Sequence, residues 1–316
     1  MSEIIESRIT REFAAIKNLA GFIHSRSSKG CNLKFILPCG STRIITVLPA
    51  RFAVLPDTLA VDVSYYEIIS MLPTGSRVLK NNLTISFEQI KESLTGSLNG
   101  LKSNSLIIDK KWDENEEENE QNFISFIETF KRYHRSAKKI DGFAQLPVKT
   151  LVELKGNLYN FCNAFLEGDT EKLSVLLVRC AGIGRGLTPS SDDALIGIIA
   201  VLTGAILVRH PSASDVLCDF IDNVKHSYKD VFPYEYAISN YSTEIGKKYL
   251  CCAAEGRFSD MLLDLVSDLY GGKPCNWEND IDRVAQIGST SGMDTLIGVS
   301  IGCKYLLNNH HFSAKN

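Results

Sequence analysis

The chain has 316 residues, 44% of them hydrophobic, which is enough for one large or two ordinary domains with a substantial core. The formal net charge of −3 argues against a nucleic-acid-binding surface, which needs a clustered basic face. The N-terminus lacks the apolar core of a secretory signal, and the longest apolar helical run is shorter than the roughly 20 residues of a membrane span. We therefore expect a cytoplasmic protein without nucleic-acid or membrane partners.

Nine cysteines are scattered along the chain without a Cys-x-x-Cys motif, and no histidine pair has the spacing of zinc ligands. Their odd number and apolar surroundings predict reduced, buried thiols. The sequence therefore predicts no metal site built from Cys and His, and no cysteine has an obvious histidine partner for nucleophilic catalysis.

The first 110 residues contain two patterns. Apolar side chains in residues 3–28 recur near the 3.6-residue period, which predicts a leading helix. Between residues 30 and 110, short β-branched runs alternate with Pro, Gly and Asn, which predicts a mainly antiparallel sheet or small barrel. The predicted strands are residues 32–37, 43–48, 59–63, 77–79, 83–87 and 105–108. Lys80-Asn81-Asn82 is predicted to be a hairpin turn, because Asn tolerates left-handed backbone.

Residues 113–121 form an acidic run. Such a run can be a partner-binding or metal-attracting patch, but a helix start explains it more simply. Acids at the start and bases at the end of a helix complement its dipole, and the far end of this segment carries Lys131, Arg132, Arg135, Lys138 and Lys139. The charged stretch marks the expected boundary between domains.

Almost no strand signal follows residue 145, and the predicted helices are residues 148–166, 169–181, 190–208, 213–227, 242–255, 258–270, 278–286 and 292–307. Asp169, Ser242 and Ser259 are expected N-caps. The predicted fold class is α+β. It comprises a β-rich N-terminal domain with a leading helix (1–112), a charged connecting helix (113–145) and an all-α domain (146–316). The all-α domain carries two buried glycine-containing helices and the candidate ligand site.

Two helix starts in the all-α domain share one pattern. Residues 182–197 read Gly-Ile-Gly-Arg-Gly-Leu-Thr-Pro-Ser-Ser-Asp-Asp-Ala-Leu-Ile-Gly, and residues 288–298 read Gly-Ser-Thr-Ser-Gly-Met-Asp-Thr-Leu-Ile-Gly. Both contain Ser-x-x-Asp-x-Leu-Ile-Gly, at an offset of 101 residues that pairs Asp193 with Asp294. A serine three residues before an acid predicts a capping-box-like helix start.

The serine of each copy, Ser190 or Ser291, is the expected N-cap, and the acid is expected to reach back to a second free amide. In the first copy Thr188 is a rival cap, because Pro189 would then occupy the first helical position. Both helices that follow are apolar all round and contain glycine, which indicates buried helices that approach each other closely. If they pack in the same sense, their starts converge on one pocket.

Such a pocket suits a small anion, because helix starts present free N–H groups and a partial positive charge. The candidate ligand-binding residues are Gly184, Arg185, Gly186, Leu187, Thr188, Ser190, Ser191, Ser289, Thr290, Ser291 and Gly292. Asp192, Asp193 and Asp294 are the candidate catalytic acids. One acid per copy is expected to cap its helix. That leaves Asp192 to bind a ligand NH₂ group, orient a neighbour or help to hold Mg²⁺.

Two known phosphate motifs are excluded at the first loop: no Gly-Lys-Ser/Thr follows it, and the stretch before it looks helical rather than βαβ. Residues 239–243, Ser-Asn-Tyr-Ser-Thr, are either a third polar rim of the pocket or a simple cap by Ser242, and the simple cap is favoured.

At these residues the chain resembles the AllH family, which is associated with the oxamate carbamoyltransferase of anaerobic allantoin breakdown. The family pattern is a Gly-x-Gly-x-Gly-Leu-Thr-Pro-Ser-Gly-Asp-Asp loop, followed later by Gly-His-Thr-Ser-Gly-x-Asp and an apolar helix. Residues 182–193 match the first segment and residues 288–294 the second. The chain departs from the pattern at Arg185, Ser191 and Ser289, where the pattern has proline, glycine and histidine.

The resemblance implies carbamoyl transfer between oxalurate plus phosphate and oxamate plus carbamoyl phosphate. It also implies a subunit of a larger assembly with AllG-like and FdrA-like partners and a small anionic substrate. We expect no cofactor and no metal site, apart from the Mg²⁺ alternative below. Two alternatives stay open. One is a non-catalytic binding or structural subunit, which the lack of a visible His–Cys or His–Ser pair favours. The other is an acyl-phosphate enzyme that uses Mg²⁺ at Asp192 and Asp193.

Overall fold

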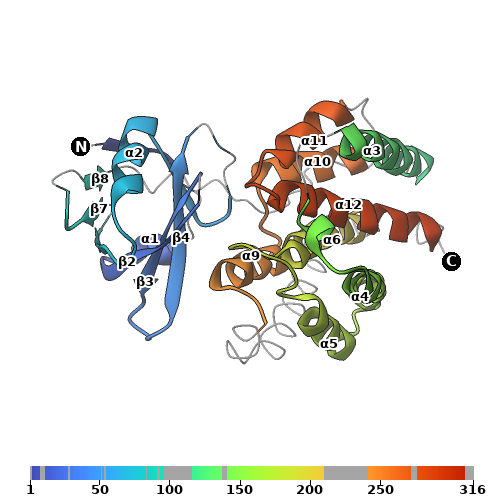
Figure 1. Cartoon of the computed structure of the whole chain (residues 1–316), viewed down its shortest axis with the longest axis horizontal. Coiled ribbons are helices and arrows are strands. Elements are labelled where there is room, and N and C mark those ends of the chain that lie inside the picture. Colours follow the sequence, from blue (N-terminus) through green and yellow to red (C-terminus); the bar gives the residue numbers. More distant parts are fainter. Residues whose placement is uncertain are drawn as a thin grey trace. The chain divides into compact units, whose positions relative to one another are not determined.

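The computed structural model describes residues 2–7, 11–27, 29–50, 52, 55–82, 84–90, 93–95, 116–136, 141–209, 241–271 and 276–309. The chain divides into two compact units, Met1–Asn104 and Ser105–Asn316. The first unit is mainly strands and the second is helical (Figure 1). The α+β fold class expected from the sequence is thereby confirmed.

The N-terminal unit is a closed barrel with the strand order β1-β5-β4-β3-β2-β6-β7-β8. The pairs β4–β5 and β1–β8 are parallel, and the other neighbours are antiparallel. Alternate apolar side chains fill the interior, Leu33, Phe35, Ile45 and Val47 among them. The strands are β1 (Ser2–Ser7), β2 (Asn18–Arg26), β3 (Cys31–Ile36), β4 (Thr42–Pro49), β5 (Thr58–Val61), β6 (Arg77–Asn81), β7 (Thr84–Phe87) and β8 (Ser93–Thr95).

Five of the predicted strands correspond to β3, β4, β5, β6 and β7, and Asn82 has the positive φ of 51° expected for the turn before β7. The predicted strand at 105–108 lies outside the described residues. Two short helices, α1 (Arg11–Ala15) and α2 (Val63–Met71), accompany the barrel.

The predicted leading helix over residues 3–28 is wrong. This stretch forms β1, α1 and β2. In β2 the side chains of Leu19 and Ile23 are buried, and so is Gly21 between them, so burial follows the two-residue period of a strand. The same spacing of Leu19 and Ile23 also fits a helix face. Hydrogen bonding to β3 on one side and β6 on the other selects the strand.

The second unit contains α3 (Glu116–Ser136), η1 (Gly142–Gln145), α4 (Val148–Glu167), α5 (Thr170–Cys180), α6 (Ser190–Arg209), α9 (Glu244–Ala254), α10 (Asp260–Tyr270), α11 (Trp277–Ala285) and α12 (Ser291–Asn308). Every helix predicted in this part appears except the one at 213–227, which lies outside the described residues. The end of the acidic run opens α3, whose last turn carries His134 and Arg135.

Side-chain caps fix several of these helix starts. Asp169 accepts from the Lys172 N–H at 3.0 Å, and Ser259 accepts from the Leu262 N–H, as the sequence predicts. The predicted cap by Ser242 is wrong, because α9 begins one residue later and Thr243 accepts from the Gly246 N–H at 2.9 Å. Ser242 donates to a different partner, described below.

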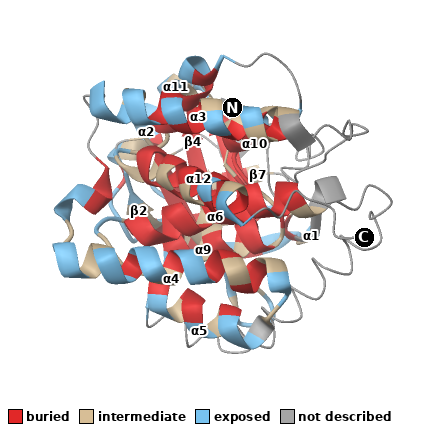
Figure 2. Ribbon diagram, turned by 90° about the vertical axis from the view of Figure 1, so that its right-hand side faces the viewer, coloured by how far each residue is buried: buried red, intermediate tan, exposed pale blue. Residues whose placement is uncertain are grey.

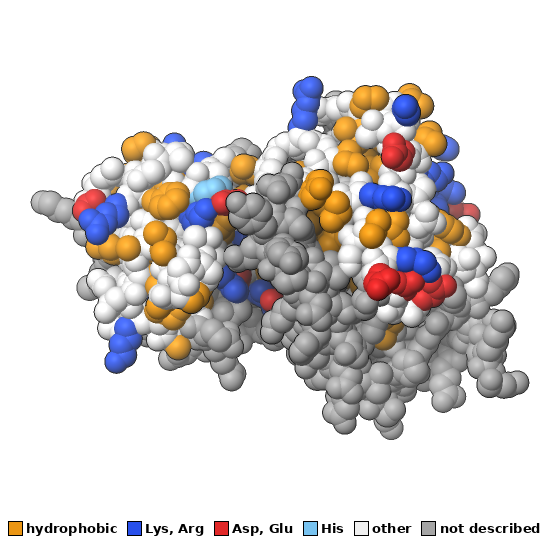
Figure 3. All heavy atoms as spheres, turned by 90° about the horizontal axis from the view of Figure 1, so that it is seen from below, with side chains coloured by type: hydrophobic (Ala, Val, Ile, Leu, Met, Phe, Trp, Pro, Cys, Tyr) orange, Lys and Arg blue, Asp and Glu red, His pale blue; other side chains and the backbone are white. Residues whose placement is uncertain are grey.

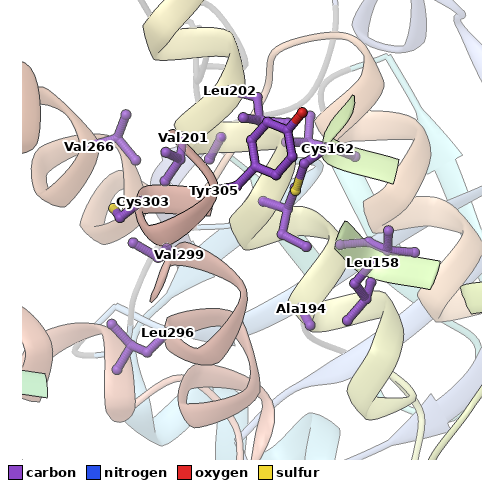
Figure 4. Packing of buried hydrophobic residues seen from close by; sticks show 14 of the residues in the cluster. Leu158, Cys162, Ala194, Val201, Leu202, Val266, Leu296, Val299, Cys303 and Tyr305 are labelled. Carbon is purple, nitrogen blue, oxygen red and sulfur yellow. The ribbon is translucent and has the colours of Figure 1, made fainter. Parts of the chain in front are cut away.

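Helices α6 and α12 form the centre of the helical unit. Their ribbons are largely buried in Figure 2, and α3, α4, α9, α10 and α11 pack around them. In Figure 4, side chains of α4, α6, α10 and α12 meet in one apolar cluster that includes Leu158, Val201, Val266 and Val299. The predicted pair of buried glycine-containing helices is therefore the core of this unit.

On the face that Figure 3 shows, acidic and basic side chains of the described residues are interspersed with apolar ones, and neither charge dominates. No helix among the described residues is long and apolar enough to span a membrane. No disulfide joins the described cysteines. Five of them are buried as predicted, whereas Cys39 is exposed.

Candidate functional site

Close helix packing brings the two copied motifs together. A Cβ atom added to Gly197 of α6 would lie 2.2 Å from the Thr295 carbonyl oxygen of α12. A Cβ atom added to Gly298 would lie 2.0 Å from the carbonyl oxygen of Ala194. Only glycine permits this approach. Thr188 lies against Ser291 at the two starts, and a Cβ atom added to Gly302 would lie 3.1 Å from the Val201 Cβ atom further along. Start therefore meets start and later residues meet later residues, so α6 and α12 run parallel with their N-termini side by side.

The packing is reciprocal. Ala194 contacts Gly298, and their counterparts 101 residues away in the other copy, Thr295 and Gly197, contact each other as well. This exchange of equivalent partners is the property of a two-fold interface. The two copies of the motif are therefore related by a local two-fold axis that runs between the helices.

Hydroxyl groups join the two helix starts directly. The Oγ1 atom of Thr188, in the loop before α6, lies 2.8 Å from the Oγ atom of Ser291 at the start of α12. The N–H groups of Gly184, Gly186 and Ser190 donate to no group among the residues that the structure describes. The rim of the twin starts therefore presents hydroxyls and backbone amides, which are the donors that bind oxyanions.

A third segment closes one side of this arrangement. The Gly142 N–H of η1 donates to Oδ1 of Asp294 at 2.8 Å. A Cβ atom on Gly142 would lie 1.9 Å from the Ser190 Oγ, so the glycine backbone rests directly against the serine. Behind it, Asp141 caps η1 and lies 2.7 Å from the Nε2 atom of His134. Gly142 thus contacts the serine of one copy and the acid of the other.

Three buried acids lie under the rim: Asp192 and Asp294 are 0% exposed and Asp193 is 4% exposed. Burial raises the pKa of Asp294 to about 6, partly offset by the Gly142 hydrogen bond, and burial likewise raises the pKa of Asp192 to about 6. The pKa of Asp193 is raised well above its ordinary value by burial and then by the charge of Asp294. The acids therefore hold protons at far higher pH than ordinary carboxyl groups.

Asp192 is engaged within the protein. Its Oδ1 accepts from the Gly182 N–H at 2.7 Å, and its Oδ2 accepts from the Ser242 hydroxyl. Gly182 has a φ of 78°, and a Cβ there would lie 1.3 Å from the carbonyl oxygen of Tyr241. Asp192 therefore fastens the glycine loop to the segment before α9. Thr243 adds a second fastening, because its hydroxyl donates to the Leu187 carbonyl.

Three polar atoms remain without partners among the described residues at the site: Ser190 Oγ, Asp193 Oδ2 and Asp294 Oδ2. A buried polar atom without a partner costs about 1–3 kcal/mol. Native proteins keep few such atoms, and those they keep call for an explanation in terms of function, water or a bound group. The unpaired atoms cluster at the point where the two copies meet.

Residues 180–303 match the family model for oxamate carbamoyltransferase subunit AllH. This part of the chain is therefore similar to the AllH family. The match begins at the end of α5, covers both copied motifs and ends within α12, so the AllH segment contains the rim and its three acids. Gly142 and the N-terminal barrel lie outside it. No solved structure matches the chain.

Within this AllH segment the predicted site residues differ in exposure. Arg185, Gly186 and Ser289 are exposed, and Gly184, Leu187, Thr188, Thr290 and Ser291 are half-buried at the rim. Ser190, Ser191 and Gly292 are buried with the acids. Two of the buried residues have internal partners. Ser191 Oγ accepts from the Ile183 N–H at 2.8 Å, and the Gly292 N–H donates to the Ile287 carbonyl oxygen at 2.9 Å.

The predicted capping boxes are wrong. Ser190 and Ser291 are the first helical residues rather than N-caps, and Thr290, the N-cap of α12, makes no side-chain cap bond. The serine of each copy instead lies by the acid of the other. A Cβ on Gly142 would lie 1.9 Å from the Ser190 Oγ and 2.8 Å from the Asp294 Oδ2, and hydrogen bonding by Ser291 lowers the pKa of Asp193. The parallel packing of the helices produces this exchange, which sequence spacing within one helix does not reveal.

Sequence reasoning missed Gly142, Asp141 and His134. The Asp-Gly pair at 141–142 is an ordinary turn signal, and nothing in its neighbourhood indicates contact with an acid 152 residues away. Among the described residues, no group of three or more His, Cys, Asp or Glu side chains has an arrangement that could hold a metal ion.

Proposed function

We propose that the chain serves as a subunit of an oxamate carbamoyltransferase-type system and binds a small carboxylate or phosphate ligand at the twin helix starts. The observation that carries the proposal is the convergence of two helix N-termini, joined by Thr188 and Ser291, over unpaired buried carboxyl oxygens. The description of the matching AllH family supplies the reaction class.

The arrangement suits an anion that also carries N–H groups. The partial positive charges of two helix starts add at the rim, where the hydroxyls and free amides can hold carboxylate or phosphate oxygens. The acids below accept N–H donors. Oxamate, oxalurate and carbamoyl phosphate combine both ends in one small molecule, whereas a simple dianion would place oxygens against the carboxyl groups.

The proposed reaction exchanges a carbamoyl group. An oxygen of hydrogen phosphate attacks the carbamoyl carbon of oxalurate, the bond from that carbon to the oxamate nitrogen breaks, and the phosphate proton ends on that nitrogen. The products are carbamoyl phosphate and oxamate. Amides aimed at the tetrahedral oxyanion stabilise the transition state. Asp294, with a pKa of about 6, is suited to pass the proton near neutral pH.

A non-catalytic binding subunit is the second candidate. Ser289 is exposed at the place where the family pattern has a histidine, so the chain lacks that acid–base group at the rim. AllG-like and FdrA-like subunits are the proposed partners. Carbamoyl phosphate formation by the purified chain alone supports catalysis in this subunit, whereas formation only in a mixture with those partners supports the binding role.

Calorimetric titration of the full-length chain with oxamate and with phosphate tests the binding proposal. Ser291→Ala removes a rim hydroxyl that contacts Thr188, and we expect it to weaken binding about tenfold. Ser300→Ala is the matched control, because it removes an unpaired buried hydroxyl nine residues further along the same helix, about 13 Å from the start. If Ser291→Ala and Ser300→Ala bind these ligands with equal affinity, or the unaltered chain binds neither ligand, the site does not lie at the helix starts.

A further inference from the structure

The local two-fold axis divides the site into two equivalent halves. The first half-site consists of Asp294 with Ser190, and the second consists of Asp193 with Ser291. Each half joins the acid of one helix to the serine of the other. Because the helices pack reciprocally, a group that fits against one half has a geometric counterpart at the other.

The first half-site is occupied by the chain itself. Gly142 donates its N–H to the Asp294 carboxylate, and its Cα lies so close to Ser190 that an added Cβ would be 1.9 Å from the Ser190 Oγ. A peptide N–H next to a carbonyl is a secondary amide. The first half-site therefore shows an amide N–H bound by the acid beside the serine, while Ser190 Oγ and Asp294 Oδ2 keep no hydrogen-bond partner among the described residues.

The second half-site has no such occupant among the described residues. Asp193 is only 4% exposed, yet its Oδ2 has no hydrogen-bond partner among the residues that the structure describes. The hydroxyls of Thr188 and Ser291 share one hydrogen bond at 2.8 Å, and both lie close enough to Asp193 to lower its pKa. Both residues are half-buried, whereas Ser190 of the first half-site is fully buried. The second half-site therefore lies nearer to the rim than the first.

We propose that Asp193 accepts an amide N–H of the ligand, in the way that Asp294 accepts the N–H of Gly142. This inference rests on the proposed function and assigns the orientation of the substrate within it. The NH₂ end of an oxamate-like molecule faces Asp193, and its anionic end faces the rim hydroxyls and amides. Asp193 then selects a primary amide over a carboxylate, because a second carboxylate would place oxygen against oxygen.

The electrostatics of the acid agree with this assignment. Burial and the charge of Asp294 disfavour the ionised form of Asp193 in the chain alone. An incoming N–H donor favours the ionised form, as hydrogen bonds to a carboxylate generally do. At the first half-site the Gly142 N–H has this effect on Asp294. Ligand binding at Asp193 supplies the same missing partner.

Oxamate and oxalate form the test pair, because they differ chiefly in an NH₂ group against an oxygen. The full-length chain is titrated with each by calorimetry at pH 8, and we expect oxamate to bind at least about tenfold more tightly. In Asp193→Asn the side-chain amide can donate to an oxygen, so the preference for oxamate should disappear or reverse. Ser300→Ala should keep it.

The outcomes are distinguishable. Equal binding of oxamate and oxalate by the unaltered chain, or an undiminished preference for oxamate in a folded Asp193→Asn variant, overturns the inference and leaves the proposed function standing. A switch of preference in Asp294→Asn but not in Asp193→Asn also overturns it. Binding of neither ligand by the unaltered chain overturns the proposed function itself. If circular dichroism shows that Asp193→Asn does not fold, the ratio of the oxamate affinity to the oxalate affinity in the unaltered chain decides.

Discussion

Replacing Asp294 with asparagine should stabilise the protein at pH 8 and change it little at pH 4. Asp294 is fully buried, and its pKa rises from 3.8 to about 6 on folding, chiefly through burial. Between those two values the folded chain binds more protons than the unfolded chain. The stability of the unaltered protein therefore falls as pH rises through this window and levels off above it.

The magnitude follows from the two pKa values. The gap between 3.8 and about 6, at about 1.36 kcal/mol for each pKa unit, corresponds to about 3 kcal/mol at pH 8. At pH 4 the same relation leaves less than about 1 kcal/mol. Asparagine keeps the shape and the oxygen that accepts the Gly142 N–H but carries no charge. Its loss of charge also relieves Asp193, which adds to the gain.

Urea denaturation of the full-length chain, followed by circular dichroism at both pH values, measures the effect. Asp169→Asn is the control of opposite sign, because Asp169 is a half-buried N-cap whose pKa is lowered by its hydrogen bond and ion pair with Lys172. It should gain no stability at pH 8. An Asp294→Asn variant that gains nothing at pH 8, or gains equally at pH 4, would refute the argument that burial of this charge weakens the fold.

Four further substitutions probe the helices and the loop. Gly298→Ala places a Cβ 2.0 Å from a carbonyl oxygen of α6 and should lower the free energy of unfolding, measured in urea, by about 1–3 kcal/mol. Gly156→Ala is its control, because a Cβ added there meets nothing within 4 Å, and it should raise the free energy of unfolding by up to about 1 kcal/mol. Asp169→Ala removes the cap of α5 and should cost about 1 kcal/mol in the same assay. Ser242→Ala removes a hydroxyl that positions Asp192, so we expect weaker oxamate binding in calorimetry with an unchanged helical dichroism signal; unchanged affinity would contradict that positioning role.

The architecture of the helical unit was predictable because its decisive signals are local. Periodicity located the described helices, and the interior glycines of the twin motifs indicated close packing, as Gly197 and Gly298 now show. The barrel strands after residue 30 were predictable from β-branched runs between turn residues. The stretch around β2 was not, because the spacing of Leu19 and Ile23 satisfies both periods and only pairing with β3 and β6 decides between them.

The internal order of the site could not be read from one helix at a time. The three-residue spacing from Ser190 to Asp193 is the same whether the serine serves its own helix or the neighbouring one. The parallel crossing decides, and it places Ser190 by Asp294. Gly142 contacts both residues although it lies 152 positions before Asp294 in the sequence, and no local pattern encodes such a contact. The sequence therefore indicated residues that the structure brings together, but not which of them contact one another.

The energetics favour a functional reading of the twin acids over a structural one. A duplicated helix pair that served only to fill a core would be more stable with neutral side chains, since burying Asp294 alone weakens the fold by about 3 kcal/mol above its pKa. Burial of Asp193 adds to that cost, because its Oδ2 receives no hydrogen bond from any described residue. Proteins commonly retain such destabilising arrangements at sites of activity, where a ligand completes what the chain leaves unpaired. The half-site that Gly142 fills indicates the kind of group that completes the other.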